Sequence, residues 1–94
     1  VWGAGHQALA VLALADLGTK IRYVVDSAPF KQGRFTPATH LPIVSPDHFE
    51  RNAVSAVIVM AASYSDEVAR NLRARPGNAA TIAVLRDHGL EILG

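Results

Sequence analysis

The sequence predicts an α/β fold in which a mostly parallel sheet lies between helices on both of its faces. Two observations lead to this prediction. First, extended apolar runs alternate along the chain with segments of helical character, which is the order of parallel strands joined by crossover helices. Second, the run Ile21–Val25 is nearly continuously apolar, as in a strand covered on both faces. The predicted architecture is therefore a Rossmann-like fold of three layers.

The first half of the chain is predicted to open with the end of a strand at Val1-Trp2 and a tight turn through glycine. A helix is expected over His6–Leu17. Its apolar residues lie on all sides, so we expect burial on more than one side. Gly18 is a natural C-cap, since glycine readily adopts the left-handed conformation that often ends a helix. A parallel strand over Ile21–Val25 follows.

The second half continues the alternation. Ser45-Pro46-Asp47 is typical of a helix start, because serine caps the first turn, proline fits the first position and an acid favours the first turn. The expected elements, in order, are a strand over Leu41–Val44, a helix ending near Asn52, a strand over Ala56–Met60, a helix capped by Ser63 with Asp66 as partner and stopped by Pro76-Gly77, and a strand over Thr81–Leu85. Residues 79–93 fit either strand, turn and strand, or helix and strand.

Length and composition limit the class of protein. The chain has 94 residues, which fit a single domain over 1–94, and it begins in what reads as the middle of a strand, so we expect a domain excised from a longer chain. It is 50% hydrophobic with a net charge of +1, which excludes a disordered chain and a strongly basic nucleic-acid binder. The absence of cysteine excludes disulfides and thiolate metal sites. The longest apolar run, Ala8–Ala15, is too short for a bilayer, which needs about 20 residues. We expect a cytoplasmic protein with no membrane partner.

The turn between the first strand and the first helix is a variant of the dinucleotide-binding fingerprint, Gly3-x-Gly5-x-x-Ala8. Glycines there let the backbone approach a phosphate, which the N-terminal end of the helix attracts. Asp26 follows Gly5 by 21 residues (26 − 5), where a dinucleotide-binding domain would hold a ribose. His6 lies beside the turn and could help to hold an anion. The ordinary structural interpretation stays equally open: the glycines form only a tight turn, and Asp26 only ends a strand.

A long loop over Asp26–Ile43 is the second candidate for a functional segment. Its prolines and a glycine interrupt any helix, and loops of this length in a compact domain are often functional. Lys31, Arg34 and His40 supply donors suited to phosphate or sugar hydroxyls. The functional interpretation is that Lys31 and Arg34 clamp a nucleotide diphosphate, or the neighbouring domain that shares it. The ordinary interpretation is a set of solvated loop charges.

The sequence indicates no metal centre and no catalytic constellation. The histidines lack short ligand spacing and a companion cysteine, so no metal site is predicted at His6, His40, His48 or His88. No Ser–His–Asp arrangement and no paired carboxylates emerge, so no catalytic residue is assigned.

The pattern D-x-x-P-x-K-Q-G-R-x-x-P-x-T-H-x-P-I over Asp26–Ile43, together with Gly3-Ala4-Gly5-His6, resembles a known family. It is similar to the C-terminal domain of the sugar C-methyltransferases, which use S-adenosylmethionine to methylate a carbon of a nucleotide-linked deoxysugar. The resemblance extends to about Ala62. The family usually has glycine where this chain has Ala38, so a left-handed backbone is in question at that residue.

The resemblance implies that this domain closes over a nucleotide sugar within a three-part enzyme. An N-terminal zinc domain and a central domain that binds S-adenosylmethionine and supplies the catalytic base would make up the rest. This domain alone would hold no cofactor and would not be catalytic, and its partners would be a nucleotide-sugar-like molecule and the central methyltransferase domain. The substrate-binding residues that we expect are Gly3, Gly5, His6, Asp26, Lys31, Arg34 and His40.

Two other functions stay open. A nicotinamide-dinucleotide-binding (NAD(P)-type) module is supported by the glycine turn and Asp26, but not by the proline-rich loop. A non-catalytic interaction domain would leave the glycine turn empty. The apolar first helix also predicts contact through an apolar face, with the parent protein or in a homodimer.

Overall fold

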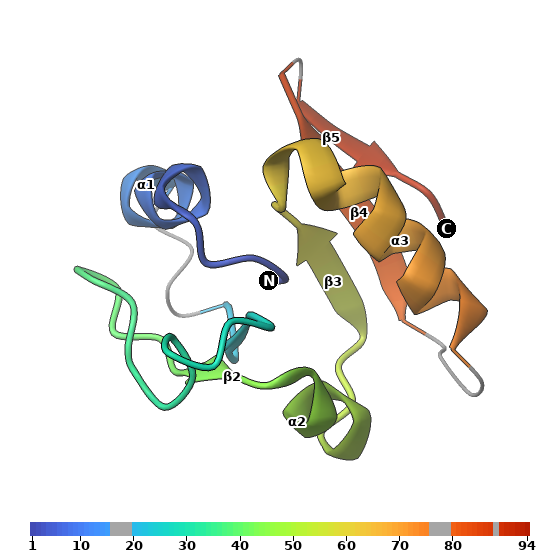
Figure 1. Ribbon diagram of the computed structural model, residues 1–94. Helices are drawn as coiled ribbons and strands as arrows, with labels where there is room; N and C mark the ends of the chain where they lie inside the picture. Colours follow the sequence, from blue (N-terminus) through green and yellow to red (C-terminus); the bar gives the residue numbers. More distant parts are fainter. Residues whose placement is uncertain (16–19, 76–79, 88) are drawn as a thin grey trace.

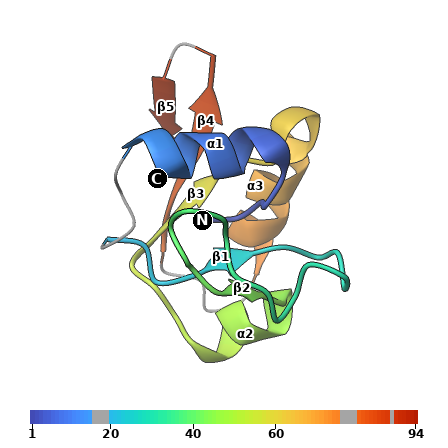
Figure 2. The ribbon, with the colours of Figure 1, turned by 90° about the vertical axis from the view of Figure 1, so that its left-hand side faces the viewer.

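The computed structural model describes residues 1–15, 20–75, 80–87 and 89–94 of the chain. The elements follow in the order α1 (His6–Ala15), β1 (Val24–Val25), β2 (Ile43–Val44), α2 (Pro46–Arg51), β3 (Ala56–Val59), the 3₁₀ turn η1 (Ala62–Tyr64), α3 (Ser65–Ala74), β4 (Thr81–Arg86) and β5 (Gly89–Ile92). Helix α3 packs against β4 (Figure 1), and α1 and α2 lie above and below the pair of β1 and β2 (Figure 2). No helix in the described ranges is long and apolar enough to cross a membrane.

The strands form two sheets, so the predicted Rossmann-like fold of three layers around one mostly parallel sheet is wrong. Strands β1 and β2 form a parallel pair, and β3, β4 and β5 form a second sheet in that order. In the second sheet β3 and β4 are parallel, but β4 and β5 are antiparallel, with Val84 opposite Glu91. The prediction failed for two reasons. The chain after Arg86 folds back as a hairpin, and the N-terminal segment contributes only isolated bridges instead of a full strand.

Trp2 joins the two sheets. It forms isolated parallel bridges with Val25 of β1 and with Val59 of β3. Its N–H donates to the carbonyl of Ile58 at 2.9 Å, and its own carbonyl accepts the N–H of Met60 at 2.9 Å. The backbone of Trp2 therefore fixes the starting point of the glycine turn between the ends of β1 and β3.

Apolar side chains gather in two clusters, and neighbouring residues of β1 belong to different ones. Val24 packs with Leu12 of α1 in one cluster, whereas Val25 packs with Leu72 of α3 in the other. All four side chains are at most 1% exposed. Since successive residues of a strand point to opposite faces, the two clusters lie on opposite sides of β1.

Most predicted elements are present with shorter bounds. The first helix is confirmed up to Ala15, while Leu17, its predicted C-cap Gly18 and the predicted stop at Pro76-Gly77 lie outside the described residues. The strands expected over Ile21–Val25, Leu41–Val44 and Ala56–Met60 shrink to β1, β2 and β3. For residues 79–93, the described part follows the strand, turn and strand alternative.

The two predicted helix caps have opposite outcomes. Ser45 caps α2 as predicted, because its side chain accepts the N–H of His48 at 3.4 Å and Pro46 takes the first position. Ser63 does not cap α3, since it lies in the 3₁₀ turn and α3 begins after Tyr64 without a side-chain cap. The hydroxyl of Ser65 instead accepts the N–H of Ala61 at 3.0 Å.

The turn at Ala38 adopts the left-handed conformation that the sequence left in question, with a φ of 64°. Buried Thr36 closes this turn: its N–H donates to the carbonyl of Leu41 at 2.8 Å, and its Oγ1 accepts the N–H of Leu41 at 2.9 Å. The N–H of His40, which also has a positive φ of 53°, donates to the carbonyl of Thr36 at 3.0 Å. These hydrogen bonds stabilise the left-handed conformation of Ala38, which an alanine otherwise disfavours.

We expect Ala38→Gly to raise the free energy of unfolding by on the order of 0.5–1 kcal/mol. The left-handed conformation costs an L-residue roughly 1–2 kcal/mol, and glycine removes this cost. The greater entropy of glycine in the unfolded chain offsets only part of the stability gained. Ala53→Gly is the matched control, because Ala53 is exposed and has no positive φ, so this change should lower stability. Urea denaturation of both variants checks the difference, and a loss of stability in Ala38→Gly would contradict it.

Candidate functional site

A cavity of about 530 Å³ lies at the glycine turn, where the N-terminal end of α1 meets the chain that leaves β1 and β3. The predicted site residues Gly3, Gly5, His6, Asp26 and Lys31 all line it. Its volume falls in the usual range for small-molecule sites. The structure thus brings together segments that are far apart in the sequence, the turn at the start of α1 and the base of the long loop.

Asp26 ties the loop to the glycine turn. Its Oδ2 accepts the N–H of Ala4 at 3.0 Å, and its Oδ1 accepts the N–H of Ala28 at 2.8 Å. The carbonyl of Asp26 accepts a hydrogen bond from the side-chain amide of Gln32 at 2.9 Å. Because the Asp26 side chain is only 15% exposed, these bonds form in a poorly solvated place where they are strong. Asp26 therefore anchors the loop base, and both carboxylate oxygens already have a donor.

Lys31 brings positive charge to the same cavity. Its Nζ donates to the carbonyl of Ala4 at 3.2 Å and lies 3.7 Å from Oδ2 of Asp26. The side chain is 31% exposed, so one side of the ammonium faces solvent. An ammonium has three N–H donors, and these contacts leave at least one of them for an anion in the cavity.

The fold requires a glycine at residue 3 of the turn but not at residue 5. Gly3 has a φ of 118°, and a Cβ atom on it would lie 2.5 Å from the carbonyl oxygen of Met60. The fold therefore requires Gly3. Gly5 has no positive φ, and a Cβ atom there would meet nothing within 4 Å. Neither backbone conformation nor packing therefore requires a glycine at residue 5. Because Gly5 has no side chain, the end of α1 is open to the cavity.

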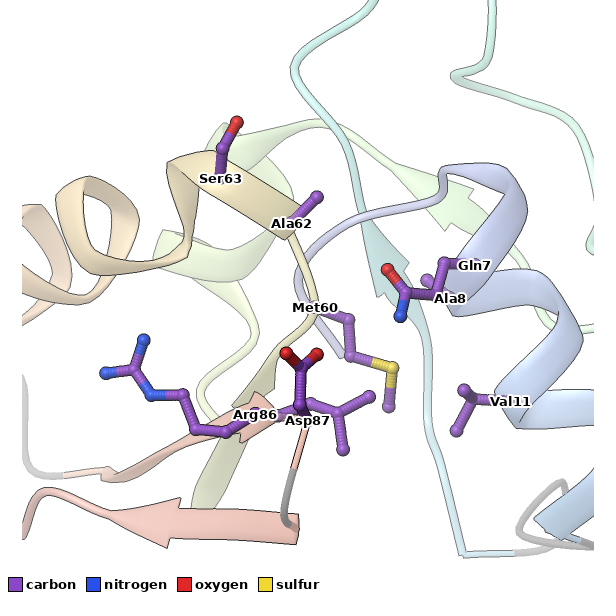
Figure 3. Close-up of a pocket in the computed structure, with 9 residues that line it drawn as sticks. Gln7, Ala8, Val11, Met60, Ala62, Ser63, Arg86 and Asp87 are labelled. Atoms are coloured by element: carbon purple, nitrogen blue, oxygen red, sulfur yellow. The ribbon is translucent and has the colours of Figure 1, made fainter.

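A second cavity, of about 630 Å³ (Figure 3), adjoins the first. The two share Gln7, Ala8, Met60 and Ala62, so they are continuous along the first turn of α1. Asp87, just after β4, lines the far side. Sequence reasoning missed Gln7 and Asp87 as site residues. The available signals were the position of Gln7 beside the glycine turn and that of Asp87 at the end of a strand.

Arg86 borders the second cavity but is engaged elsewhere. Its guanidinium donates to Asp66 at 2.7 Å and to Glu91 at 2.9 Å. The hydrogen bond from Arg86 holds the pKa of Asp66 below its ordinary value, and the bonds to Asp66 and Glu91 raise the pKa of Arg86. The charge of Arg86 is thus balanced by these two carboxylates.

The structure does not bring Arg34 and His40 to these two cavities. Arg34 lines a separate cavity of about 390 Å³ with His48 and Arg51, and its Nε donates to the carbonyl of Phe30 at 2.9 Å. His40 is exposed on the turn after Ala38. Lys31 and Arg34, close in sequence, therefore face different cavities, and ligand binding by any of these residues stays a prediction.

Metal ligands do not converge in the part of the chain that the structure describes. Among those residues, no group of three or more His, Cys, Asp or Glu side chains is placed to hold a metal ion. His88 lies outside the described residues. The chemistry that the two cavities offer is therefore binding through backbone N–H groups, the ammonium of Lys31 and the polar side chains of Gln7 and Asp87.

We expect Gly3→Ala to destabilise the protein by several kcal/mol, and Gly5→Ala to change stability little. The new methyl group at residue 3 collides with backbone and also requires a strained φ, which costs roughly 1–3 kcal/mol by itself. The methyl group at residue 5 meets open space. Thermal denaturation of the two variants separates them, and equal melting temperatures would contradict the assignment.

Asp26→Asn should lower the free energy of unfolding by about 1–3 kcal/mol. The amide keeps one acceptor for the two N–H groups of Ala4 and Ala28, and it removes the charge that strengthens both bonds. Asp87→Asn is the matched control, because Asp87 is exposed and such changes usually stay within about ±0.5 kcal/mol. A chemical denaturation curve for Asp26→Asn that overlays that of the control would show that the anchor is unimportant.

Comparison with known proteins agrees with the resemblance drawn from the loop motif. The family model of the C-methyltransferase C-terminal domain matches residues 1–84, which include the glycine turn and the whole loop. The chain is similar to the C-methyltransferase NovU of Streptomyces niveus, with 31% identity over 71 residues. The match covers 74% of this chain and spans 17% of the length of that relative. The chain therefore belongs to the C-methyltransferase C-terminal domain family.

Proposed function

We propose that this domain binds a nucleotide-linked sugar at the glycine turn, within a methyltransferase that uses S-adenosylmethionine and whose chemistry is carried by another domain. The observation that carries the proposal is the cavity in which Gly5, which the fold does not require, lies beside the ammonium of Lys31. Family membership supports the methyltransferase context. The cavity supports the binding role.

The diphosphate of such a ligand fits the glycine turn. The first N–H groups of a helix lack intrahelical acceptors, and the positive end of the helix dipole favours an anion. Helix α1 begins at His6, and the side chains of His6 and Lys31 line the cavity at this end. A charged donor bound to a phosphate oxygen makes a hydrogen bond about twice as strong as a neutral one. The ligand would therefore place its phosphates against Gly5 and Lys31.

Asp26 has a positioning role in this proposal. It holds the N–H of Ala4 and the ammonium of Lys31, so it sets the shape of the turn and the place of the charge. No residue of this domain is assigned to methyl transfer. In the proposal, S-adenosylmethionine and zinc belong to other parts of the parent protein, as the family resemblance implies.

The structure supports the two alternative functions, a dinucleotide-binding module and an interaction domain, less well. A dinucleotide-binding module would use Asp26 to hold a ribose, but both oxygens of Asp26 already accept backbone N–H groups. An interaction role has some support, because Phe30 and Phe35 of the loop are 72% and 62% exposed and Leu14 of α1 is 87% exposed. We assign these apolar side chains to contact with the central domain. A homodimer through an apolar face stays a prediction.

Lys31→Met should weaken binding of a nucleotide sugar by roughly ten- to a hundred-fold, since a hydrogen bond to a charged group contributes about 1.5–3 kcal/mol. Gly5→Ala should weaken binding too, at unchanged melting temperature, because its methyl group covers the end of α1. Arg34→Met is the matched control and should bind as the wild type does, because Arg34 faces another cavity. Calorimetry with UDP-glucose and TDP-glucose measures the effect.

The same titration tests the alternatives. NAD and S-adenosylmethionine should bind more weakly than the better of the two sugar nucleotides. Tighter binding of NAD would favour the dinucleotide-binding module. Unchanged affinity for the sugar nucleotide in both Lys31→Met and Gly5→Ala would remove the glycine turn as its site.

A further inference from the structure

We propose that the second cavity, between the first turn of α1 and the end of β4, seats the sugar ring of the bound ligand, with Asp87 and Gln7 as the side chains that bind its hydroxyl groups. The inference rests on the proposed function. It adds the subsite, the residues that form it and the direction in which the ligand lies.

The side chains of Asp87 and Gln7 are directed into this cavity. Figure 3 shows the carboxylate of Asp87 and the amide of Gln7 pointing toward its middle, while the guanidinium of Arg86 and the hydroxyl of Ser63 point away. Asp87 directly follows β4, and Gln7 belongs to α1. A ring placed between the two elements would therefore meet a polar group on each side.

Both side chains are free to bind a ligand. Within the described ranges, neither the carboxylate of Asp87 nor the amide of Gln7 has a hydrogen-bond or ion partner. The nearest cation in the sequence, Arg86, is held by Asp66 and Glu91. A carboxylate accepts hydrogen bonds at two oxygens, and an amide both donates and accepts. Neighbouring hydroxyl groups on a sugar ring match this set of donors and acceptors.

The floor of the cavity is apolar. Ala8 and Met60 are 1% and 8% exposed, and the half-buried side chains of Val11 and Leu85 lie beside them. Such a floor suits the C–H face of a sugar ring. Among the described residues that line this cavity the cation is Arg86, whose guanidinium points away and is held by two carboxylates, and Asp87 would repel a phosphate. The second cavity therefore suits the neutral end of a nucleotide sugar and not its charged part.

The charges of the two cavities also fix the direction of the ligand. Lys31 lines the first cavity and Asp87 the second, and the shared wall of Gln7, Ala8, Met60 and Ala62 makes them continuous. The phosphates would lie at the Lys31 end and the ring at the Asp87 end. The reverse orientation would place phosphates against an unpaired carboxylate, which is unfavourable.

The test compares a nucleoside diphosphate with its glucosyl ester, using UDP and UDP-glucose, and TDP and TDP-glucose, in calorimetric titrations of the protein. We expect the wild type to bind the ester of at least one pair more tightly than the diphosphate. Asp87→Ala should weaken ester binding about tenfold or more and leave diphosphate binding unchanged or slightly tighter. Gln7→Leu should act in the same direction with a smaller effect.

Glu67→Ala is the control for net charge, because Glu67 is an exposed acid of α3 that lines neither cavity. It should leave the preference for the ester intact. An ester that binds no more tightly than its diphosphate in the wild type, or an Asp87→Ala variant that matches the wild type, overturns the inference. In that case Lys31→Met and Gly5→Ala still test the proposed function separately. If neither ligand of either pair binds the wild type, the proposed function fails and the sugar subsite fails with it.

Discussion

The carboxylate of Asp26 is the interaction on which the rest of the candidate site depends. It accepts N–H groups from Ala4 and Ala28, and thereby joins the glycine turn to a loop that lies more than twenty positions further along the chain. Lys31 completes the network, since it pairs with the same carboxylate and donates to the carbonyl of Ala4. A network of charged and backbone groups at a poorly solvated place is rigid only when each member has its partner. The position of the Lys31 ammonium in the first cavity is thus a consequence of Asp26.

The glycine turn shows how the fold and the site make different demands on the same residue type. Trp2 bridges both β1 and β3: its own N–H and carbonyl bond to Ile58 and Met60, and its neighbours Val1 and Gly3 bond to Val25. The chain therefore leaves Trp2 close to the carbonyl of Met60. Only a residue without a side chain fits at Gly3. At Gly5 this steric constraint is absent, because a Cβ atom there would meet nothing within 4 Å. A sequence pattern cannot separate these two glycines, since the distinction lies in the distance to Met60, a residue in the distant segment after β3.

Local signals could be predicted well from the sequence, and pairing over distance could not. The cap at Ser45 depends on neighbours within a few residues, and it was predicted from residue type. The fold class was wrong because strand direction depends on how the chain returns after Arg86, which no local preference determines. Ala38 adopts a conformation that its own side chain disfavours, because Thr36 and Leu41 close the turn around it. The second cavity was not predicted because Gln7 and Asp87 lie at opposite ends of the sequence and line one cavity only in the folded chain.

The arrangement of charge around β4 explains why Asp87 is available to a ligand. Arg86 directly precedes Asp87 in the sequence and borders the same cavity. Here the guanidinium of Arg86 points away from the second cavity (Figure 3). It donates to Asp66 at the start of α3 and to Glu91 of β5. Two carboxylates balance the charge of this guanidinium, and Asp87 has no ion partner among the described residues. The hairpin of β4 and β5, which makes the sheet mixed, supplies Glu91 as one of the two partners of Arg86. The carboxylate of Asp87 beside α1 therefore stays open to a ligand.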